Sequence, residues 1–295
     1  MAEYSFETVD VFTHQRFGGN PLAVFPDSEG LSDREMQQLA AEMNLSETTF
    51  VLPPADASNT ARVRIFNRNH EMPFAGHPMV GTAFVLARRR SEPGESLRFE
   101  VPAGLVTVRL SRTTDGAVQG AIIEAPQPLT LGVQIGAEQV AESVGVAASE
   151  LIVSNHVPTL ASVGNTYVIA EVTEGGLHQA SPNLAAFRRI LDATPGLDGR
   201  FSLYLYNRRG RAISARMFAP VVGTWEDPAT GSAATPLAAL LLSLSGGVRD
   251  EFTIHQGVQM GRPSLLEAAA WQTLEGIRAS VGGTCVPVLR GEAAL

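Results

Sequence analysis

The sequence has a single cysteine, Cys285, and no apolar run long enough to cross a membrane. One cysteine excludes an intrachain disulfide framework and fits a reducing compartment. The longest apolar stretches are shorter than the roughly 20 residues that a spanning helix needs. Residues 1–12 lack the basic and apolar segments of a secretory signal. We therefore expect a soluble, cytoplasmic protein with no membrane partner.

Positive charge is also scarce. The chain has 22 basic and 30 acidic residues, a formal net charge of −8 and a pI near 5.3. Binding to nucleic acid needs a basic face that neutralises phosphates. The run Arg88-Arg89-Arg90 is too short to provide one and is typical of a solvated helix end. This balance predicts no nucleic-acid partner.

The motifs of several common chemistries are missing. His70 and His77 lie seven residues apart, with no H-E-x-x-H motif and no paired cysteines, so no metal site is predicted. No P-loop and no G-x-G-x-x-G motif after a strand is present, so no nucleotide cofactor is indicated. The segment 230–234, TGSAA, is not the G-x-S-x-G elbow of an α/β-hydrolase. We expect no cofactor.

A near-duplicated phrase is the main feature that is present. Residues 64–83 read RIFNRNHEMPFAGHPMVGTA, and residues 216–235 read RMFAPVVGTWEDPATGSAAT. The matching positions are Arg64, Phe66, Pro73, Gly76 and His77 in the first copy, and Arg216, Phe218, Pro228, Gly231 and Ser232 in the second. The second copy has three more residues between its Phe and its Pro. The phrase predicts two similar halves that face one site.

The pattern of apolar residues supports this division. Strands are predicted at 4–12, 22–25, 48–52, 62–67, 97–101, 105–110 and 118–125, with a capped helix from Ser32 to Asn44 and a wholly apolar helix over 78–87. The second half repeats much of this order, with strands within 162–172 and at 201–206 and 212–218 and with helices at 183–192 and 233–243. The Pro-rich segment 124–129 is the predicted boundary. We expect domains of residues 1–126 and 127–295, and residues 280–295 can return to the first.

The predicted fold class is α+β, with two similar domains. Strands predominate in each half, and each half has one helix that is apolar almost all round and therefore deeply buried. Each domain is expected to be a curved, mostly antiparallel sheet or incomplete barrel wrapped around that helix.

The starts of the two apolar helices are candidate anion sites. The first N–H groups of a helix have no partner within it and carry partial positive charge, and glycine allows an anion close to the backbone. Gly76 and His77 open one helix, and Gly231 and Ser232 open the other. We expect these pairs to hold a substrate carboxylate, although each glycine alone is also an ordinary helix start.

Three further side chains are candidates for acid–base chemistry. Glu47 lies at a helix-to-strand corner, where burial would raise its pKa and suit a general base, although an exposed turn residue is the commoner case. Asp227 precedes a proline and can point toward the helix start or belong to a turn. His77 can donate a proton or merely cap the helix. Asn20, in the turn GGNP, is more often a turn residue than a ligand.

Together these segments resemble the PhzF-like phenazine-biosynthesis isomerase family, which shares the fold of diaminopimelate epimerase. The resemblance rests on VDVFT and GGNPLAVF within 9–25, EMNLSETTFV at 42–51, RIF and FAGHPMVG within 64–81, and RMFAP and EDPATGSA within 216–233. It implies a cofactor-independent isomerase and a homodimer. It places the proton-shuttling Glu on Glu47, its His and Asp partners on His77 and Asp227, and the Ser of the second helix start on Ser232.

Three functions are therefore under consideration. The first is an isomerase that moves a proton within a small carboxylate, in the manner of trans-2,3-dihydro-3-hydroxyanthranilate isomerase. The second is an amino-acid racemase or epimerase with Glu47 and Asp227 as opposed bases. Racemisation by two thiols is disfavoured, because the paired cysteines of related epimerases fall on Ala75 and Ala229. The third is a non-catalytic protein that binds a small carboxylate. Hydrolysis through Ser232 ranks last.

Overall fold

The computed structural model describes residues 2–92 and 94–295. The chain forms two compact units. The first contains the residues up to Glu124 together with Gly282–Leu295, and the second contains Ala125–Val281. The final strand, β17 (Gly276–Ala294), thus begins in the second unit and ends in the first. Each unit is described below by itself.

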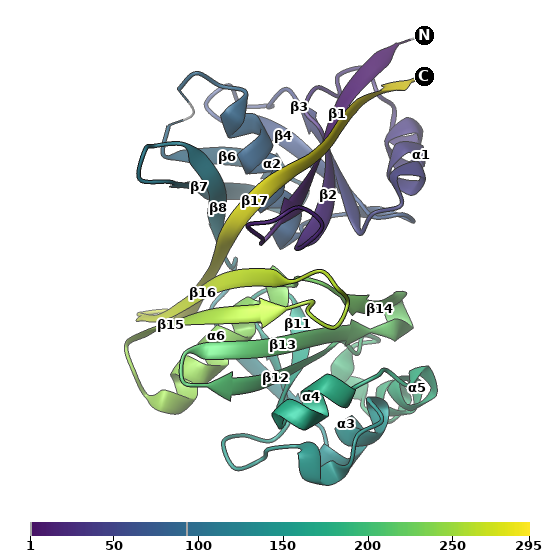
Figure 1. Ribbon diagram of the computed structural model, residues 1–295, viewed down its shortest axis with the longest axis vertical. Helices are drawn as coiled ribbons and strands as arrows, with labels where there is room; N and C mark the ends of the chain where they lie inside the picture. Colours follow the sequence, from purple (N-terminus) through teal and green to yellow (C-terminus); the bar gives the residue numbers. More distant parts are fainter. Residues whose placement is uncertain (1, 93) are drawn as a thin grey trace. The chain divides into compact units, whose positions relative to one another are not determined.

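The first unit is a closed ring of strands. Its strands are β1 (Glu3–Val11), β2 (Asn20–Phe25), β3 (Glu47–Leu52), β4 (Ala61–Phe66), β6 (Ser96–Val101), β7 (Gly104–Arg112) and β8 (Val118–Glu124), with the short β5 (Glu71–Met72) beside β4. Each of these ring strands pairs with the next, and β17 closes the ring by pairing with both β8 and β1. Glu3 lies opposite Ala294, so the two ends of the chain run side by side (Figure 1).

Helix α2 (Gly76–Arg88) fills the interior of this ring. All of its residues from Gly76 to Ala87 are buried, and it contacts β1, β2, β3, β7 and β8. Gly81 permits the close approach, since a Cβ at this position would lie 2.6 Å from Leu22 Cδ2 and 2.8 Å from Val11 Cγ2. The wholly apolar pattern of residues 78–87 therefore correctly predicted a helix surrounded by strands.

Helix α1 (Asp33–Met43) covers the outside of the first unit. Ser32 and Glu35 form the expected capping box, and Asn44 ends the helix in the left-handed conformation. The buried face of α1, including Met36, packs in one apolar cluster with Phe25 and Phe50. The sequence-based prediction of this helix is confirmed at both ends.

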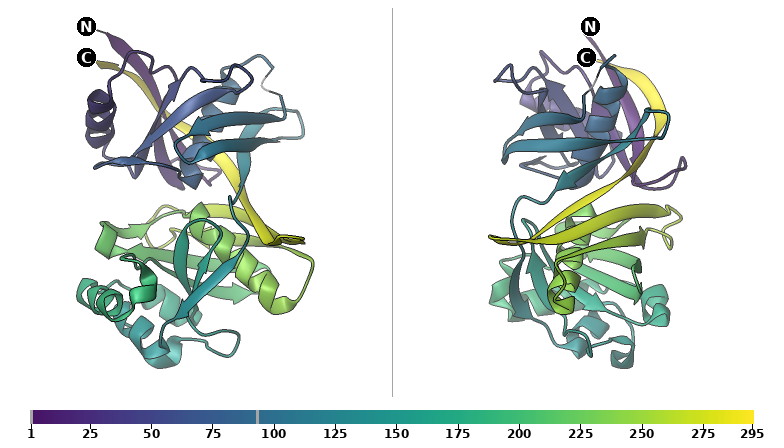
Figure 2. Two further views of the ribbon diagram at one scale, coloured as in Figure 1. Left: turned by 180° about the vertical axis from the view of Figure 1, so that it is seen from behind. Right: turned by 90° about the vertical axis from the view of Figure 1, so that its left-hand side faces the viewer.

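The second unit has the same core with more helices. Its strands are β9 (Thr130–Gln134), β10 (Thr159–Ser162), β11 (Thr166–Glu171), β12 (Leu203–Arg209), β13 (Ala212–Ala219), β14 (Thr224–Asp227), β15 (Arg249–Gln256) and β16 (Ser264–Thr273). The helices α3 (Ala137–Ser143), α4 (Glu174–Gln179) and α5 (Leu184–Ala193) gather in one layer (Figure 1), and the buried α6 (Gly231–Ser245) contacts β10, β11, β15 and β16 (Figure 2). Short 3-10 turns lie at Ala148–Glu150, Pro195–Leu197 and Pro220–Val222.

Strand pairing confirms that the two units are similar domains. In the first unit β2 is parallel to β3, β3 is antiparallel to β4, and β4 is parallel to β6. In the second unit the same sequence of directions joins β11, β12, β13 and β15. The register also agrees, because Thr48 faces Phe66 and Leu203 faces Phe218. The duplicated phrase therefore marks a duplicated fold of the α+β class.

The residues that the two copies of the phrase share make the same contacts in both units. Arg64 makes two hydrogen bonds of 2.7 and 2.6 Å to Glu71, and Arg216 makes two of 2.7 and 2.8 Å to Glu226. Each guanidinium also lies over a phenylalanine ring two residues later, at 5.1 Å in the first unit and 4.8 Å in the second. Each ion pair thus ties the strand that carries Arg-x-Phe to the strand that leads into the buried helix.

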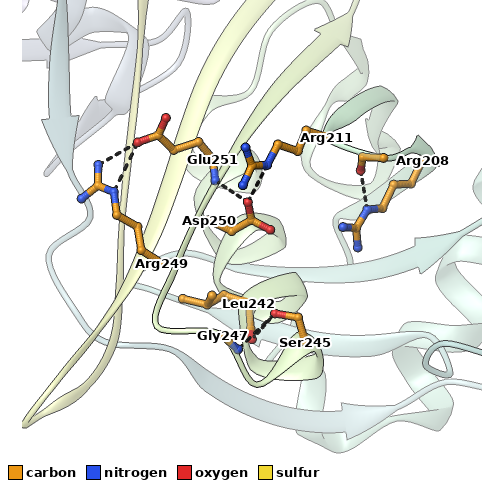
Figure 3. Close-up of polar contacts among 9 residues, drawn as sticks. Arg208, Arg211, Leu242, Ser245, Gly247, Arg249, Asp250 and Glu251 are labelled. Atoms are coloured by element: carbon orange, nitrogen blue, oxygen red, sulfur yellow. Dashed lines mark hydrogen bonds and ion pairs between the residues drawn. The ribbon is translucent and has the colours of Figure 1, made fainter.

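The far end of α6 is closed by local contacts (Figure 3). Ser245 donates to the carbonyl of Leu242 and accepts from the N–H of Gly247, after which Arg249 pairs with Glu251 and Arg211 with Asp250. The arginines drawn there are held by acidic or carbonyl oxygens.

In the described part of the chain, no helix is long and apolar enough to cross a membrane.

Some sequence-based boundaries need correction. Helix α6 begins at Gly231 rather than residue 233, and β12 begins at Leu203 rather than residue 201. Strands β5, β9, β10, β14 and β15–β17 and helices α3 and α4 were not predicted from the sequence. Strand β17 pairs with β1, at the other end of the chain. Strand β15 pairs with the next strand, β16, and its alternation of buried and exposed residues was a signal that the prediction missed.

Candidate active site

The two buried helices begin without a side-chain cap. The N-cap residues are Ala75 for α2 and Thr230 for α6, and among the residues that the structure describes neither makes a side-chain hydrogen bond to its helix. By contrast, Ser32 caps α1 and Asn183 caps α5 in this way. The first N–H groups of both buried helices are therefore left to other partners, which is the condition for binding an anion.

Glu47 and His77 lie together at the start of α2. Glu47 is the first residue of β3, beside Leu22 of β2, and His77 is the second residue of α2. Glu47 Oε2 lies 3.4 Å from His77 Nε2, and the two side chains are 16% and 8% exposed. The structure therefore brings together two of the three predicted acid–base residues, within the first unit.

The ring of His77 is neutral. Burial lowers the pKa of His77 to about 3, and a hydrogen bond to the backbone of Pro21 acts in the opposite direction. Pro21 has no N–H, so the ring must donate to its carbonyl, and Nε2 makes no hydrogen bond among the described residues. The donor is thus Nδ1, and Nε2 presents a lone pair toward Glu47. His77 can accept or share a proton with Glu47, but it is not a standing cation.

The buried histidine predicts a pH-dependent stability. An exposed histidine in the unfolded chain has a pKa of about 6.5, whereas that of folded His77 is about 3. Above pH 6.5 both states are neutral, and as the pH falls below it only the unfolded chain binds a proton. The free energy of unfolding of the wild type should therefore fall by up to about 1.4 kcal/mol per pH unit between pH 6.5 and 4 because of this histidine. We expect His77→Gln to lack this contribution.

Urea unfolding of both proteins at pH 8, 7, 6, 5 and 4.5 measures this effect. The difference in the free energy of unfolding between wild type and His77→Gln should be constant at pH 7–8 and should change steadily below pH 6.5. Equal pH slopes in the two proteins would contradict a buried neutral ring.

Asn20 is fixed close to this pair. It is the first residue of β2, is fully buried, and directly precedes the Pro21 whose carbonyl orients His77. The preceding Gly19 has φ +60, and a Cβ there would lie 2.3 Å from the carbonyl oxygen of Val11. The turn GGNP is therefore a tight turn, as predicted, and it places a buried amide at the end of the strand that holds His77.

The second unit carries the other predicted residues around the start of α6. Asp227 ends β14, is 9% exposed, and accepts a hydrogen bond from Thr230 Oγ1 through Oδ2. Ser232 Oγ lies 2.6 Å from the hydroxyl of Tyr167 on β11. Each helix start therefore has a polar residue after its glycine that a neighbouring strand orients: His77 through the Pro21 carbonyl, and Ser232 through Tyr167.

Three residues of this region were missed by reasoning from the sequence. Thr230 contacts Asp227, Tyr167 contacts Ser232, and Gln256 contacts both Asp227 and Thr230. A signal for Gln256 was available, because it continues the buried alternation of Phe252 and Ile254 in β15. A polar side chain on the apolar face of a strand needs buried partners.

The arrangement can hold an anion and move a proton. In the first unit the start of α2 offers backbone donors beside Glu47 and neutral His77, a pair that can take up or release a proton. Among the described residues, no group of three or more His, Cys, Asp or Glu side chains is placed to hold a metal ion.

Comparison with known sequences gives consistent results. The family model described as phenazine biosynthesis-like protein, PhzC-PhzF, matches residues 9–291. An uncharacterised isomerase of Mesorhizobium japonicum is 37% identical over 99% of both chains. The trans-2,3-dihydro-3-hydroxyanthranilate isomerase of Pseudomonas chlororaphis is 34% identical over 98% of both chains.

Comparison with solved structures supports the same fold. A crystal structure of a PhzF-family phenazine biosynthesis protein from Bacillus anthracis superposes with a TM-score of 0.88 at 25% identity, covering 100% of both chains. A hydroxyproline epimerase from Agrobacterium vitis, solved with trans-4-hydroxy-L-proline, has a TM-score of 0.63 at 14% identity, covering 99% of this chain and 93% of its own. The second likeness is one of fold alone. The two-domain fold expected from the sequence is confirmed.

Proposed function

The chain belongs to the phenazine biosynthesis-like PhzC-PhzF family and is an isomerase, and on this basis we propose that it moves a proton within a small cyclic carboxylate without a cofactor. Glu47 is the proposed base. The observation that carries the proposal is the contact between Glu47 and a neutral, buried His77 at the start of α2. A substrate of the trans-2,3-dihydro-3-hydroxyanthranilate type fits this chemistry, because its carboxylate acidifies a ring C–H.

The proposed reaction needs one proton and no net change in oxidation state. The Glu47 carboxylate takes a proton from a substrate carbon and becomes a carboxylic acid, while the C–H electron pair spreads into the conjugated system. The protonated Glu47 then returns a proton to another carbon of the same molecule. The backbone N–H groups at the start of α2 stabilise the transient enolate-like charge, and His77 Nε2 can accept the carboxylic proton in a hydrogen bond while Glu47 holds it.

Two features of the composition support a reaction carried by the protein's own carboxylate. The sequence contains no lysine, since all 22 basic residues are arginine. A side-chain Schiff base with pyridoxal phosphate, the usual cofactor for protons next to an amino-acid carboxylate, is therefore excluded. Cys285 is the single cysteine, so the chain lacks the pair of thiols that a two-thiol mechanism needs.

For Asp227 we propose a role as a hydrogen-bond acceptor for a substrate amino or hydroxyl group. Its position beside the start of α6 supports this role. The unit would then offer an acceptor and backbone donors to two neighbouring groups of one substrate. Epimerisation with Asp227 as a second base remains the alternative, favoured only by the shared fold with the hydroxyproline epimerase. A homodimer and a cytoplasmic location remain predictions.

Turnover in deuterated water tests the proposed function. We would incubate the protein with trans-2,3-dihydro-3-hydroxyanthranilate and, separately, with trans-4-hydroxy-L-proline, and follow both by NMR and optical rotation. An isomerase changes the connectivity of the first compound, with deuterium at the protonated carbon. An epimerase changes only the configuration of the second. Binding without change of either compound would identify a non-catalytic carboxylate-binding protein and refute the proposal.

A further inference from the structure

Gln256 is a fully buried amide beside the start of α6 that uses all of its hydrogen-bonding capacity. It ends β15 and is 0% exposed. Its Nε2 donates to the main-chain carbonyl of Asp227 at 2.8 Å and to Thr230 Oγ1 at 3.0 Å. Its Oε1 accepts from the N–H of Thr230 at 3.2 Å and from the hydroxyl of Tyr204 at 3.0 Å. An amide has two donors and two acceptor sites, so none is left over.

These partners allow only one orientation of the amide. The Asp227 carbonyl can only accept and the Thr230 N–H can only donate, so exchanging Nε2 and Oε1 would place like groups against each other at both positions. Tyr204 is itself fully buried and lies on strand β12, which β13 separates from β15. The side chain of Gln256 is therefore held in one orientation by Tyr204 of β12 and by the segment that enters α6.

The orientation of Gln256 determines that of the Thr230 hydroxyl. Because Thr230 Oγ1 accepts a hydrogen from Gln256, its own hydrogen is directed to Asp227 Oδ2. The donors thus point one way, from Tyr204 to Gln256, from Gln256 to Thr230, and from Thr230 to the carboxylate of Asp227. A carboxylate that receives such a bond is held in one rotamer and kept as an acceptor.

The residues of the first unit at the corresponding positions cannot form this series of hydrogen bonds. The duplicated phrase aligns Asp227 with Met72 and Thr230 with Ala75. The register of β13 with β15, compared with that of β4 with β6, aligns Gln256 with Val101. None of these three side chains can make the corresponding contacts. This series of hydrogen bonds is therefore specific to the second unit and is not part of the fold that the two units share.

We propose that Gln256 and Thr230 are positioning residues that hold the carboxylate of Asp227 toward the substrate at the start of α6. The inference rests on the proposed function of Asp227 as a substrate acceptor. It also bears on the mechanism. A carboxylate fixed by directed donors receives hydrogen bonds from a substrate amino or hydroxyl group and does not itself take up the transferred proton.

A matched pair of substitutions at Thr230 tests the proposal. Thr230→Ser keeps the hydroxyl, and Thr230→Val keeps the shape but removes it. With trans-2,3-dihydro-3-hydroxyanthranilate, Thr230→Ser should remain within about twofold of wild type. Thr230→Val should lose roughly 10- to 100-fold in kcat/KM, as expected for a hydrogen bond to a charged group. In an Asp227→Asn background the same Thr230→Val change should have little further effect, because both act through one carboxylate.

Ligand-free crystal structures of both Thr230 variants decide the inference independently of turnover. The Asp227 carboxylate should keep its position in Thr230→Ser and turn away in Thr230→Val. Gln256→Met, which leaves Thr230 intact, should give the same displacement. An unmoved Asp227 in Thr230→Val and Gln256→Met, or additive losses in kcat/KM, would overturn the proposal. If wild type fails to convert the substrate, the proposed function fails, while the position of Asp227 still decides this inference.

Discussion

Replacing Glu47 by glutamine should lower kcat by roughly 10²- to 10⁴-fold, the usual contribution of a general base. Glutamine has the same shape, and its amide can donate to the Nε2 lone pair of His77 that now faces Glu47. The fold should therefore be retained, with a melting temperature close to that of wild type and nearly unchanged substrate binding. Steady-state kinetics together with calorimetric binding separates the loss of chemistry from a loss of affinity.

Two further variants sharpen this prediction. Glu42→Gln makes the same chemical change on the exposed surface of α1, five residues away, and should leave kcat unchanged. Glu47→Asp keeps the acid but withdraws it by one methylene, and misplacement by about 1 Å can cost about 10²-fold. Turnover by Glu47→Gln equal to that of wild type would exclude Glu47 as the base and leave the reaction to another group.

The second large effect concerns stability. Arg216 and Glu226 are only 7% and 12% exposed, and Arg216 Nη1 also donates to the carbonyls of Leu177 and Ala180 at 3.0 and 2.7 Å. Removing one partner of a buried ion pair leaves the other charge uncompensated, which typically costs about 3–5 kcal/mol. We expect Arg216→Leu to lower the free energy of unfolding by this amount in urea titrations.

The first copy of the phrase supplies the matched control. Arg64 makes the same bidentate bond, but it is 19% exposed, and its partners Glu71 and Asp33 are 30% and 84% exposed. Both carboxylates can regain water when the arginine is lost. Arg64→Leu should therefore lower the free energy of unfolding by less than half as much as Arg216→Leu. Adding Glu226→Leu to Arg216→Leu should recover part of the stability. Equal losses in the two units would show that burial does not set the cost.

Local signals in the sequence accounted for much of the fold. The capping box at Ser32 and Glu35 set one end of α1, and the all-round apolar residues of α2 and α6 showed that these helices are buried. The spacing of Arg, Phe, Pro and Gly revealed the duplication. These features depend on residues within one or two turns of each other, which is why the sequence alone was sufficient.

Contacts between distant segments could not be predicted in this way. The pairing of β1 with β17 joins Glu3 to Ala294, and no local pattern indicates such a register. The same holds at the site, where Gln256 contacts Asp227, which lies 29 residues earlier in the chain. The residue pattern suggested Glu47 and His77 separately and the family resemblance paired them, but the distance of 3.4 Å between Glu47 Oε2 and His77 Nε2 is a property of the fold.

The central claim is that the uncapped start of α2 holds the substrate beside Glu47. Backbone amide NMR of the Glu47→Gln protein, titrated with trans-2,3-dihydro-3-hydroxyanthranilate, tests it most directly because this variant should bind without turnover. We expect the amide signals of Gly76 and His77 to shift as the substrate is added, while those at the side-chain-capped start of α1 stay in place. Unmoved signals of Gly76 and His77 in a protein that binds the substrate would contradict the claim.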